Sequence, residues 1–300
     1  MGLWKNYLQP GNIEDALQSM ASAKSSLAVI SGGTDLILDI EQGRHAAVDT
    51  MIDVTCIPEM HEIRLVNDLI FLGASVTLVE IIKSRILNEH AQCVVESCGL
   101  MGGPQVRNVA TIGGNVAHAL PAGDGIISLL ALGTEVQIAS LEGRRWQSLE
   151  EIFAAPGQTT FDRNRELVIG FRFPVRKAGE ASAFSRLMRP QGVAIAIMNM
   201  AVWIRSQQPR LLQDIRIAMG PAGPRPLRAR ETEKFLKDKQ LDENTFQQAC
   251  CILDDEVQLR TSPHRATAEY RHHLLPILFK QVIEIAVGRV SGNPREFSLE

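Results

Sequence analysis

The sequence predicts a protein of the α+β class that is divided into several lobes, and three observations support this prediction. The chain has 300 residues, which is more than one compact core usually holds. Helix and strand patterns alternate in the first third, as they do in a β-α-β unit with parallel strands. After a polar linker at residues 174–180, three strand patterns follow one another and lead into a helical tail.

The alternating pattern lies in residues 1–57, the first expected lobe. Asn12 precedes two acidic residues and an apolar stripe, which is typical of a capped helix. Residues 27–30 form a short apolar run that ends at two glycines, so we expect a buried strand there. A short helix at residues 36–41 and a returning strand at residues 48–54 complete the expected unit.

Residues 58–176 form the second expected lobe. A hairpin is expected at residues 63–73, because two apolar runs flank a turn of Asn and Asp. Thr77 has the properties of a helix cap, and the segment at residues 99–125 is the richest in glycine. A further helix is expected at residues 89–98, and strands at residues 135–139, 144–149 and 167–173.

Residues 177–300 form the third expected lobe, which combines a three-stranded antiparallel sheet with a helix bundle. The strands are expected at residues 183–188, 193–204 and 211–218. Helices are expected at residues 244–253 and 264–290. Pro276 is expected to disturb the longer helix, because proline lacks a backbone N–H.

Composition and charge argue against several classes of protein. Lys and Arg total 31 against 34 Asp and Glu, so the net charge of −3 does not favour a broad basic face for nucleic acid. No apolar run approaches the ~20 residues of a membrane span, and residues 1–24 lack a signal-peptide pattern. The five cysteines form no C-x-x-C pair, which favours reduced thiols over a disulfide framework or a zinc or iron–sulfur site. We therefore expect a cytoplasmic protein with no metal site on this chain.

Two glycine turns are the candidate binding elements. Gly32 and Gly33 join a strand end to a helix start, where backbone N–H groups can hold a phosphate with no Cβ in the way. Gly113 and Gly114 form a second such turn, and Asp124 follows it as a candidate acceptor for ligand hydroxyl groups. The G-x-G-x-x-G and P-loop patterns are absent, so these residues predict either a phosphate-containing cofactor between two turns or a purely structural role.

The residues around both turns resemble those of a known family. Residues 31–36 (S-G-G-T-D-L) resemble its A-G-G-T-D-L loop, and residues 103–115 (G-P-Q-V-R-N-V-A-T-I-G-G-N) resemble its G-P-Q-I-R-N-x-A-T-I-G-G-N stretch. Residues 265–271 (R-A-T-A-E-Y-R) resemble its R-A-S-A-E-Y-R helix start. On these motifs the chain is identified as similar to the FAD-binding (medium) subunit of the molybdenum hydroxylases, the family of xanthine dehydrogenase and carbon monoxide dehydrogenase.

The resemblance implies a flavin domain of the vanillyl-alcohol-oxidase (PCMH) type, with two α/β lobes around FAD and a third C-terminal lobe. It implies that the pyrophosphate is held by the first loop, Ile30, Ser31, Gly32, Gly33, Thr34, Asp35 and Leu36. The flavin and ribityl region would be lined by Thr111, Ile112, Gly113, Gly114 and Asn115, and Asp124 would accept hydrogen bonds from hydroxyl groups.

The resemblance also implies a complex of three subunits. Molybdopterin would lie on a large subunit that hydroxylates the substrate, and iron–sulfur clusters on a small subunit would pass electrons to FAD. The FAD would pass them to NAD or another acceptor, and no catalytic acid or base is expected on this chain. Xanthine or another purine, nicotinate, an aldehyde and carbon monoxide all fit as substrates of the large subunit.

The chain departs from the family pattern at three places. Ser31 replaces the usual alanine, and acidic residues are missing near Gly192 and in the turn before His264. The last two departures lie in the C-terminal lobe and concern subunit contacts or the electron acceptor. Arg186 and Arg189 fit either a place near the flavin or a surface or partner-facing role.

Two other interpretations stay open beside the electron-transfer subunit. One is a flavin-free scaffold or assembly protein of the same fold, which the intact glycine turns and Asp124 disfavour. The other is a stand-alone flavin reductase, which is weakened because the sequence shows no acid and base set directed at a substrate.

Overall fold

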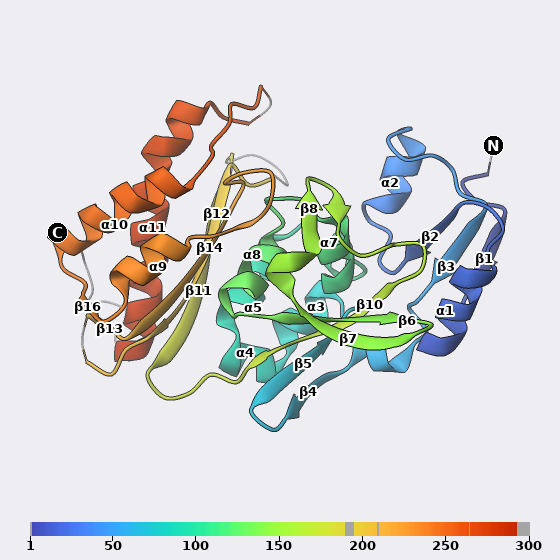
Figure 1. Ribbon diagram of the computed structural model, residues 1–300, viewed down its shortest axis with the longest axis horizontal. Coiled ribbons are helices and arrows are strands. Elements are labelled where there is room, and N and C mark those ends of the chain that lie inside the picture. The colour runs from blue at the N-terminus through green and yellow to red at the C-terminus, as the bar shows by residue number, and fades with distance from the viewer. Residues whose placement is uncertain (1, 190–194, 209, 264, 293–300) are drawn as a thin grey trace. The chain divides into compact units, whose positions relative to one another are not determined.

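The computed structural model describes residues 2–189, 195–208, 210–263 and 265–292, and the chain divides into two compact units (Figure 1). The first unit comprises residues 1–86, 101–119 and 134–174, and the second comprises residues 87–100, 120–133 and 175–300. The chain thus passes between the units several times. The prediction of three lobes, residues 1–57, 58–176 and 177–300, stays a prediction.

The first unit begins with a small parallel sheet. Its order is β1-β3-β2, formed by β1 (Asn6–Leu8), β2 (Leu27–Ile30) and β3 (Thr50–Asp53). Helix α1 (Ile13–Ser22) begins at Asn12, whose side chain accepts a hydrogen bond from the backbone of Asp15 at 2.8 Å. The β-α-β unit expected from the sequence is therefore present, with α2 (Leu36–Glu41) between β2 and β3.

The first unit also contains a five-stranded antiparallel sheet in the order β4-β5-β10-β6-β7. These strands are β4 (Ile63–Val66), β5 (Leu69–Gly73), β6 (Glu135–Ser140), β7 (Gly143–Ser148) and β10 (Leu167–Pro174). A separate short pair is formed by β8 (Phe153–Ala155) and β9 (Gln158–Thr159), and 3-10 helices η1 (Pro58–His61) and η2 (Leu149–Ile152) precede β4 and β8. The helices of this part are α3 (Leu78–Lys83), α6 (Pro104–Arg107) and α7 (Ile112–His118), and α4 (Arg85–His90) lies where the chain leaves the unit.

The second unit is built on an antiparallel sheet of four strands, one more than predicted. Its strands are β11 (Glu180–Leu187), β12 (Met198–Arg205), β14 (Asp214–Gly220) and the short β15 (Leu227–Arg228). The extra strand is only two residues long and carries no alternating pattern, so it could not be seen in the sequence. A second small pair joins β13 (Leu211–Leu212) to β16 (Lys239–Gln240).

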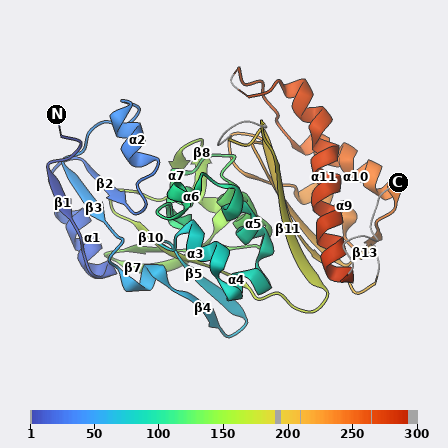
Figure 2. The same cartoon turned by 180° about the vertical axis from the view of Figure 1, so that it is seen from behind.

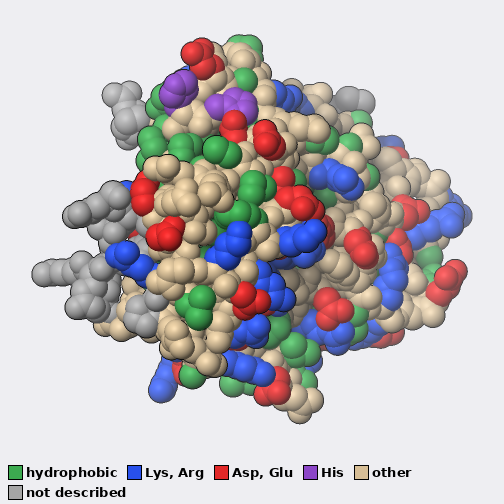
Figure 3. All heavy atoms as spheres, turned by 60° about the vertical axis from the view of Figure 1, so that its left-hand side comes forward, with side chains coloured by type: hydrophobic (Ala, Val, Ile, Leu, Met, Phe, Trp, Pro, Cys, Tyr) green, Lys and Arg blue, Asp and Glu red, His purple; other side chains and the backbone are tan. Residues whose placement is uncertain are grey.

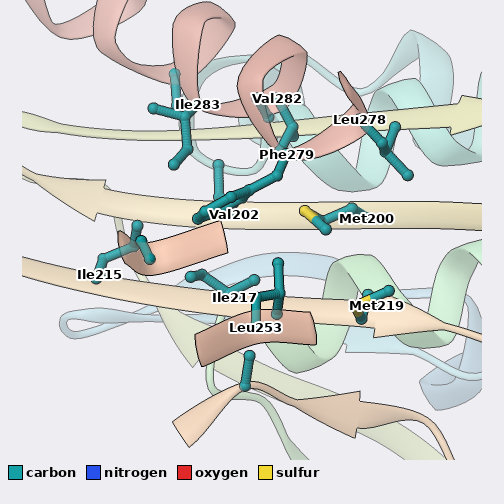
Figure 4. Close-up of a cluster of buried hydrophobic side chains, with 14 of the residues drawn as sticks. Met200, Val202, Ile215, Ile217, Met219, Leu253, Leu278, Phe279, Val282 and Ile283 are labelled. Carbon is teal, nitrogen blue, oxygen red and sulfur yellow. The ribbon is translucent and has the colours of Figure 1, made fainter. Parts of the chain in front are cut away.

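Helices cover both faces of this sheet. Helix α11 (Ala268–Ser291) crosses one face, where Phe279, Val282 and Ile283 point toward Val202 of β12 (Figures 1, 2 and 4). Helices α9 (Arg230–Leu236) and α10 (Glu243–Glu256) add Leu236 and other apolar residues to the same core. Helices α5 (Gln92–Leu100) and α8 (Asp124–Ala131) pack against β11, β12 and β14. Alternate residues of β12 therefore face different partners, and the strand is buried along almost its whole length.

Two features of the second unit differ from the sequence-based expectations. Helix α8 forms within the glycine-rich segment, where no helix was predicted. Helix α11 continues through Pro276 from Ala268 to Ser291, so the predicted disturbance does not end it. Gly192 and His264, the sites of two departures from the family pattern, lie outside the described residues.

The described surface agrees with the weak net charge. Acidic and basic side chains are interspersed on the face shown in Figure 3. Among the described residues, no helix combines the length and the apolar character that a membrane crossing needs.

We predict that Phe279→Ala lowers the free energy of unfolding by about 3–5 kcal/mol, because the ring is fully buried and its loss leaves a cavity. The ring also stacks on Phe246, with centroids 5.4 Å apart. Urea titration followed by circular dichroism measures the change. Ile277→Ala is the matched control, since Ile277 lies on the same helix but is 57% exposed, and it should change stability by about 0.5 kcal/mol or less. Equal effects of the two substitutions would contradict the described packing of α11.

Candidate functional site

The first glycine loop leaves β2 at its carboxyl end and leads into α2. Gly33 has a positive φ of +67°, a conformation that strongly favours glycine. The carbonyl of Gly33 accepts a hydrogen bond from Ile37 at 3.1 Å, which ties the loop to the helix. The loop is partly exposed over residues 31–36, so it is open to a ligand.

The donors of this loop are free. Within the described chain, the backbone N–H groups of Gly32, Gly33 and Thr34 donate no hydrogen bond, and the Asp35 side chain does not cap α2. Consecutive free N–H groups in a glycine turn form a concave surface that suits an anion. The loop can therefore bind a phosphate group without first breaking bonds of its own.

The structure brings the first loop against the second motif. A Cβ placed on Gly32 would overlap the carbonyl oxygen of Val109 and would lie 2.8 Å from the Cα of Ala110. Ser31 donates a further hydrogen bond from its hydroxyl to that of the buried Ser75 at 3.2 Å. Gly32 is thus required by a close backbone approach between two segments that are distant in sequence.

The second turn forms the start of α7. The side chain of Thr111 accepts a hydrogen bond from the backbone of Gly114 at 3.2 Å, so Thr111 is the cap of this helix. Gly113 donates from its N–H to the carbonyl of Ala74 at 2.8 Å, and a Cβ at Gly113 would lie only 2.5 Å from that oxygen. Ile112 is fully buried, so it anchors the helix in the unit instead of presenting a side chain to a ligand.

Asn115 carries an unmet hydrogen-bonding group. Its side-chain Oδ1 is buried and has no hydrogen-bond partner among the residues that the structure describes. A buried carbonyl oxygen without a donor is costly, and such atoms in native proteins usually have a missing ligand or water as partner. Asn115 therefore has an acceptor available for a donor that the protein does not supply.

Apolar side chains are exposed on the same segments. Val109, whose carbonyl touches Gly32, is 50% exposed, and Val106 and Leu38 are also exposed. Exposed apolar groups next to free phosphate-binding donors suit a ligand that has both a charged and an aromatic part. Sequence reasoning did not select these three residues or Ser75, although Val106 and Val109 lie inside the recognised stretch.

A second polar cluster lies at the carboxyl ends of β1 and β3. Asp53 accepts hydrogen bonds from the hydroxyl of Tyr7 at 2.6 Å and from the side chain of Gln9 at 3.0 Å. Its other oxygen accepts from the backbone and hydroxyl of Thr55 at 2.8 and 2.7 Å. These hydrogen bonds outweigh burial and hold the pKa of Asp53 below its ordinary value. Both oxygens of the Asp53 carboxylate thus accept hydrogen bonds from the protein. The carboxylate links the two strands, and we do not count it among the groups that bind a ligand.

Asp124 lies in the second unit, at the start of α8, and not in the unit that holds the two glycine turns. Its carboxylate accepts from Arg186 at 2.6 Å and from the Asn199 side chain at 2.5 Å, and all three side chains are buried. Burial raises the pKa of Asp124, while the hydrogen bond from Asn199 and the charge of Arg186 oppose this rise. The predicted role of Asp124 toward cofactor hydroxyl groups stays a prediction. Sequence reasoning found Arg186 but not its pairing, and it missed Asn199.

The described residues contain no group of three or more His, Cys, Asp or Glu side chains that could hold a metal ion. The candidate site in the first unit is therefore an open surface of free backbone donors, one unmet amide oxygen and apolar side chains. It can bind and position an extended anionic ligand, and it presents no acid and base pair.

Comparison with known proteins identifies relatives of this site and fold. A family model described as the FAD binding domain in molybdopterin dehydrogenase matches residues 4–176, and one described as the CO dehydrogenase flavoprotein C-terminal domain matches residues 182–286. Both glycine turns and Asp124 lie inside the first match.

Individual relatives match along nearly their whole length. The xanthine dehydrogenase FAD-binding subunit of Escherichia coli O157:H7 is 25% identical, covering 96% of this chain and 98% of the relative. The nicotine 6-hydroxylase medium subunit of Paenarthrobacter nicotinovorans is 29% identical, covering 94% of this chain and 97% of the relative. Among solved structures, carbon monoxide dehydrogenase from Hydrogenophaga pseudoflava has a TM-score of 0.89 at 26% identity, covering 95% of this chain and 98% of the matched chain. This likeness confirms the predicted α+β fold.

The Tyr7–Asp53 hydrogen bond predicts an unusual titration. The bond raises the pKa of Tyr7 from 10.0 to about 12. Because the folded pKa lies above the unfolded one, the stability from this bond is complete below pH 10 and is lost as the pH rises toward 12. The absorbance of ionised tyrosine, followed as the pH is raised, measures the titration of the two tyrosines. Tyr7→Phe should remove the part of the absorbance change that occurs near pH 12. In Asp53→Asn the late part should move toward pH 10, and a wild-type signal already complete near pH 10 would contradict the bond.

The buried pair predicts an unequal cost for single and double substitutions. Asp124→Asn should destabilise the protein by about 3–5 kcal/mol, because it leaves the buried Arg186 without a counter-charge. The double variant Asp124→Asn/Arg186→Met should cost clearly less, since no buried charge is left unpaired. Urea titration of Asp124→Asn, Arg186→Met and the double variant measures the differences. A double variant as unstable as the sum of both single variants would show that the pair contributes nothing as a pair.

Proposed function

The chain belongs to the family of FAD-binding subunits of the molybdopterin dehydrogenases, or molybdenum hydroxylases, and from this premise we propose that it is the electron-transfer flavoprotein of such an oxidoreductase complex. In this proposal a large subunit carries molybdopterin and a small subunit carries iron–sulfur clusters. Electrons reach the FAD on this chain from the clusters and leave it to NAD or another acceptor. The supporting observation is a loop with free backbone donors, packed against Val109 of the segment that also carries the unmet Asn115 oxygen, within the residues that the family model matches.

The residues of the first unit fit FAD. The N–H groups of Gly32, Gly33 and Thr34 would hold the pyrophosphate, and Ser31 would support the loop through Ser75. The Asn115 oxygen would accept a hydrogen bond from the cofactor. When bound, FAD supplies the capacity to take up and release one or two electrons. The protein's own residues would position the group.

We keep Asp124 in the proposal as an acceptor for cofactor hydroxyl groups, and its support is its place in the family stretch. Its buried partners Arg186 and Asn199 would keep the carboxylate in one orientation. We also propose a cytoplasmic location, since all five cysteines are free and such thiols are typical of reducing compartments.

The assembly with other subunits is supported by the names of the relatives. The matched chains are called an FAD-binding subunit and a medium subunit, and these names describe parts of larger enzymes. An absorbance spectrum of the purified chain tests the cofactor directly. Bands of flavin that release as FAD on heating would support the proposal. A colourless chain that also takes up no added FAD would favour the scaffold alternative.

We predict that Gly33→Val lowers FAD content at least about tenfold, because the positive φ of the glycine shapes the loop whose N–H groups would hold the phosphates. Gly43→Val is the matched control. Gly43 has nearly the same φ, +71°, but nothing lies within 4 Å of its Cβ position. The Gly43→Val variant introduces the same kind of backbone strain, but it does so after α2 and outside the loop, so this variant should keep its FAD. Full flavin occupancy in Gly33→Val would refute the assignment of this loop.

A further inference from the structure

Four arginines lie in the second unit at the start of α11, in and around the R-A-T-A-E-Y-R motif, which is not part of the proposed FAD site. Arg189 follows β11 and donates from its guanidinium to the backbone carbonyl of Arg265 at 3.3 Å. Arg271 is only 2% exposed and donates to the carbonyl of Ile197 at 2.5 Å. Arg260 lies on the same loop as Arg265, between α10 and α11.

The loop that carries these arginines is folded on itself. Ser262 donates from its N–H to Ala266 at 2.9 Å and accepts from Arg265 at 3.1 Å. The hydroxyl of Thr261 accepts from the first residue of α11, Ala268, at 3.0 Å. Hydrogen bonds within the loop therefore hold the backbone that carries Arg260 and Arg265.

The cluster has no carboxylate partner among the described residues. No ion pair involves Arg189, Arg260, Arg265 or Arg271, and the Nε of Arg271 is buried without a partner. Burial lowers the pKa of Arg271, and the charges of Arg265 and Arg260 lower it further, so these cations lie close enough to repel one another.

The position of the cluster adds to this unfavourable charge. The positive end of the α11 macrodipole lies at Ala268, and cations near a helix N-terminus are destabilising. Nearby acids are used elsewhere or form no ion pair with the cluster. Asp254 pairs with His272, Glu256 accepts from the first turn of α9, and Glu269 is exposed and forms no ion pair in the described chain. Four cations and a helix N-terminus therefore create a local excess of positive charge, against which the first turn of α11 sets one acid, Glu269.

We propose that this arginine cluster (Arg189, Arg260, Arg265 and Arg271) is a docking surface for an acidic segment of a partner subunit. The carboxylates of that segment pair with the exposed guanidinium groups of Arg189 and Arg260 and with the partly exposed one of Arg265, while the buried Arg271 adds its charge without touching the partner. The inference rests on the proposed function, since it requires that the chain works in a complex. The guanidinium fork matches carboxylate geometry with two parallel hydrogen bonds.

Exposed apolar residues favour a polypeptide over a small anion as the occupant. Tyr270 precedes Arg271 and is 51% exposed, and Met188 and Ile195 on the adjoining segments are exposed as well. Tyrosine, arginine and methionine are among the residues enriched in protein interfaces. A free phosphate would use the charge of this surface and would leave its apolar part uncovered.

Fluorescence anisotropy with a labelled oligoglutamate peptide tests the proposal on the full chain. We expect saturable binding that an oligoglutamine peptide of equal length does not show. The double variant Arg260→Gln/Arg265→Gln, which changes partly exposed residues, should weaken binding about tenfold or more. The affinity of Arg260→Lys/Arg265→Lys for oligoglutamate should lie between that of the wild type and that of the double glutamine variant, because lysine keeps the charge and lacks the planar guanidinium group. Lys237→Gln, which removes an exposed charge after α9, should bind as the wild type does.

Two outcomes would overturn the proposal. The first is no saturable binding of oligoglutamate, or equal binding in the double glutamine variant. The second is inorganic phosphate that displaces the peptide and binds as tightly, which would assign the cluster to a small anion. Flavin absorbance of the same samples separates the two proposals. The glutamine variant should keep its FAD, and a chain that binds FAD but not the peptide refutes only the docking surface.

Discussion

The close approach of Gly32 to the backbone of Val109 and Ala110 is the constraint on which the candidate site depends. It joins a loop at the end of a parallel strand to a segment almost eighty residues later in the chain. Any side chain at Gly32 would push these segments apart. The same contact places Val109 beside the free donors of the first loop, and the Ser31–Ser75 hydrogen bond fixes the loop on its other side. The anion-binding loop at Gly32 and the apolar surface at Val109 therefore depend on the same backbone contact.

The second unit shows a different use of close packing. Strand β12 is buried on both faces, so polar residues along it must find partners inside the protein. Asn199 of β12 donates from its side-chain amide to Asp124, and Arg186 of the neighbouring β11 donates to the same carboxylate, so this network joins helix α8 to the sheet. Polar residues on the buried strands thus decide how α8 is oriented, while apolar ones supply most of the free energy.

The glycine loops could be predicted from sequence because their residue types are required by local geometry and are repeated in a known family. Several elements could not be predicted, because tertiary packing overrides local preference. Helix α8 begins at Asp124 between two glycines, and only its full burial explains why it forms. Helix α11 tolerates Pro276 because neighbouring turns are packed in the core. The pairing of Asp124 with Arg186 joins residues 62 positions apart, and no local pattern reveals it.

The discontinuous composition of the two units has a consequence for how the chain folds during synthesis. Helices α5 and α8 leave the ribosome long before strands β11 and β12, on which they pack. Helix α5 must wait for about 80 further residues until β11 is made, and α8 for about 70 until β12 is made, and segments of the first unit are synthesised in between. Folding of the two units is therefore interleaved, and contacts of such long sequence separation are slow to form. A cut at the linker near residue 176 would leave α5 and α8 on the N-terminal fragment, separated from the sheet on which they pack. The boundary between the two family models is therefore not a boundary between two folding units.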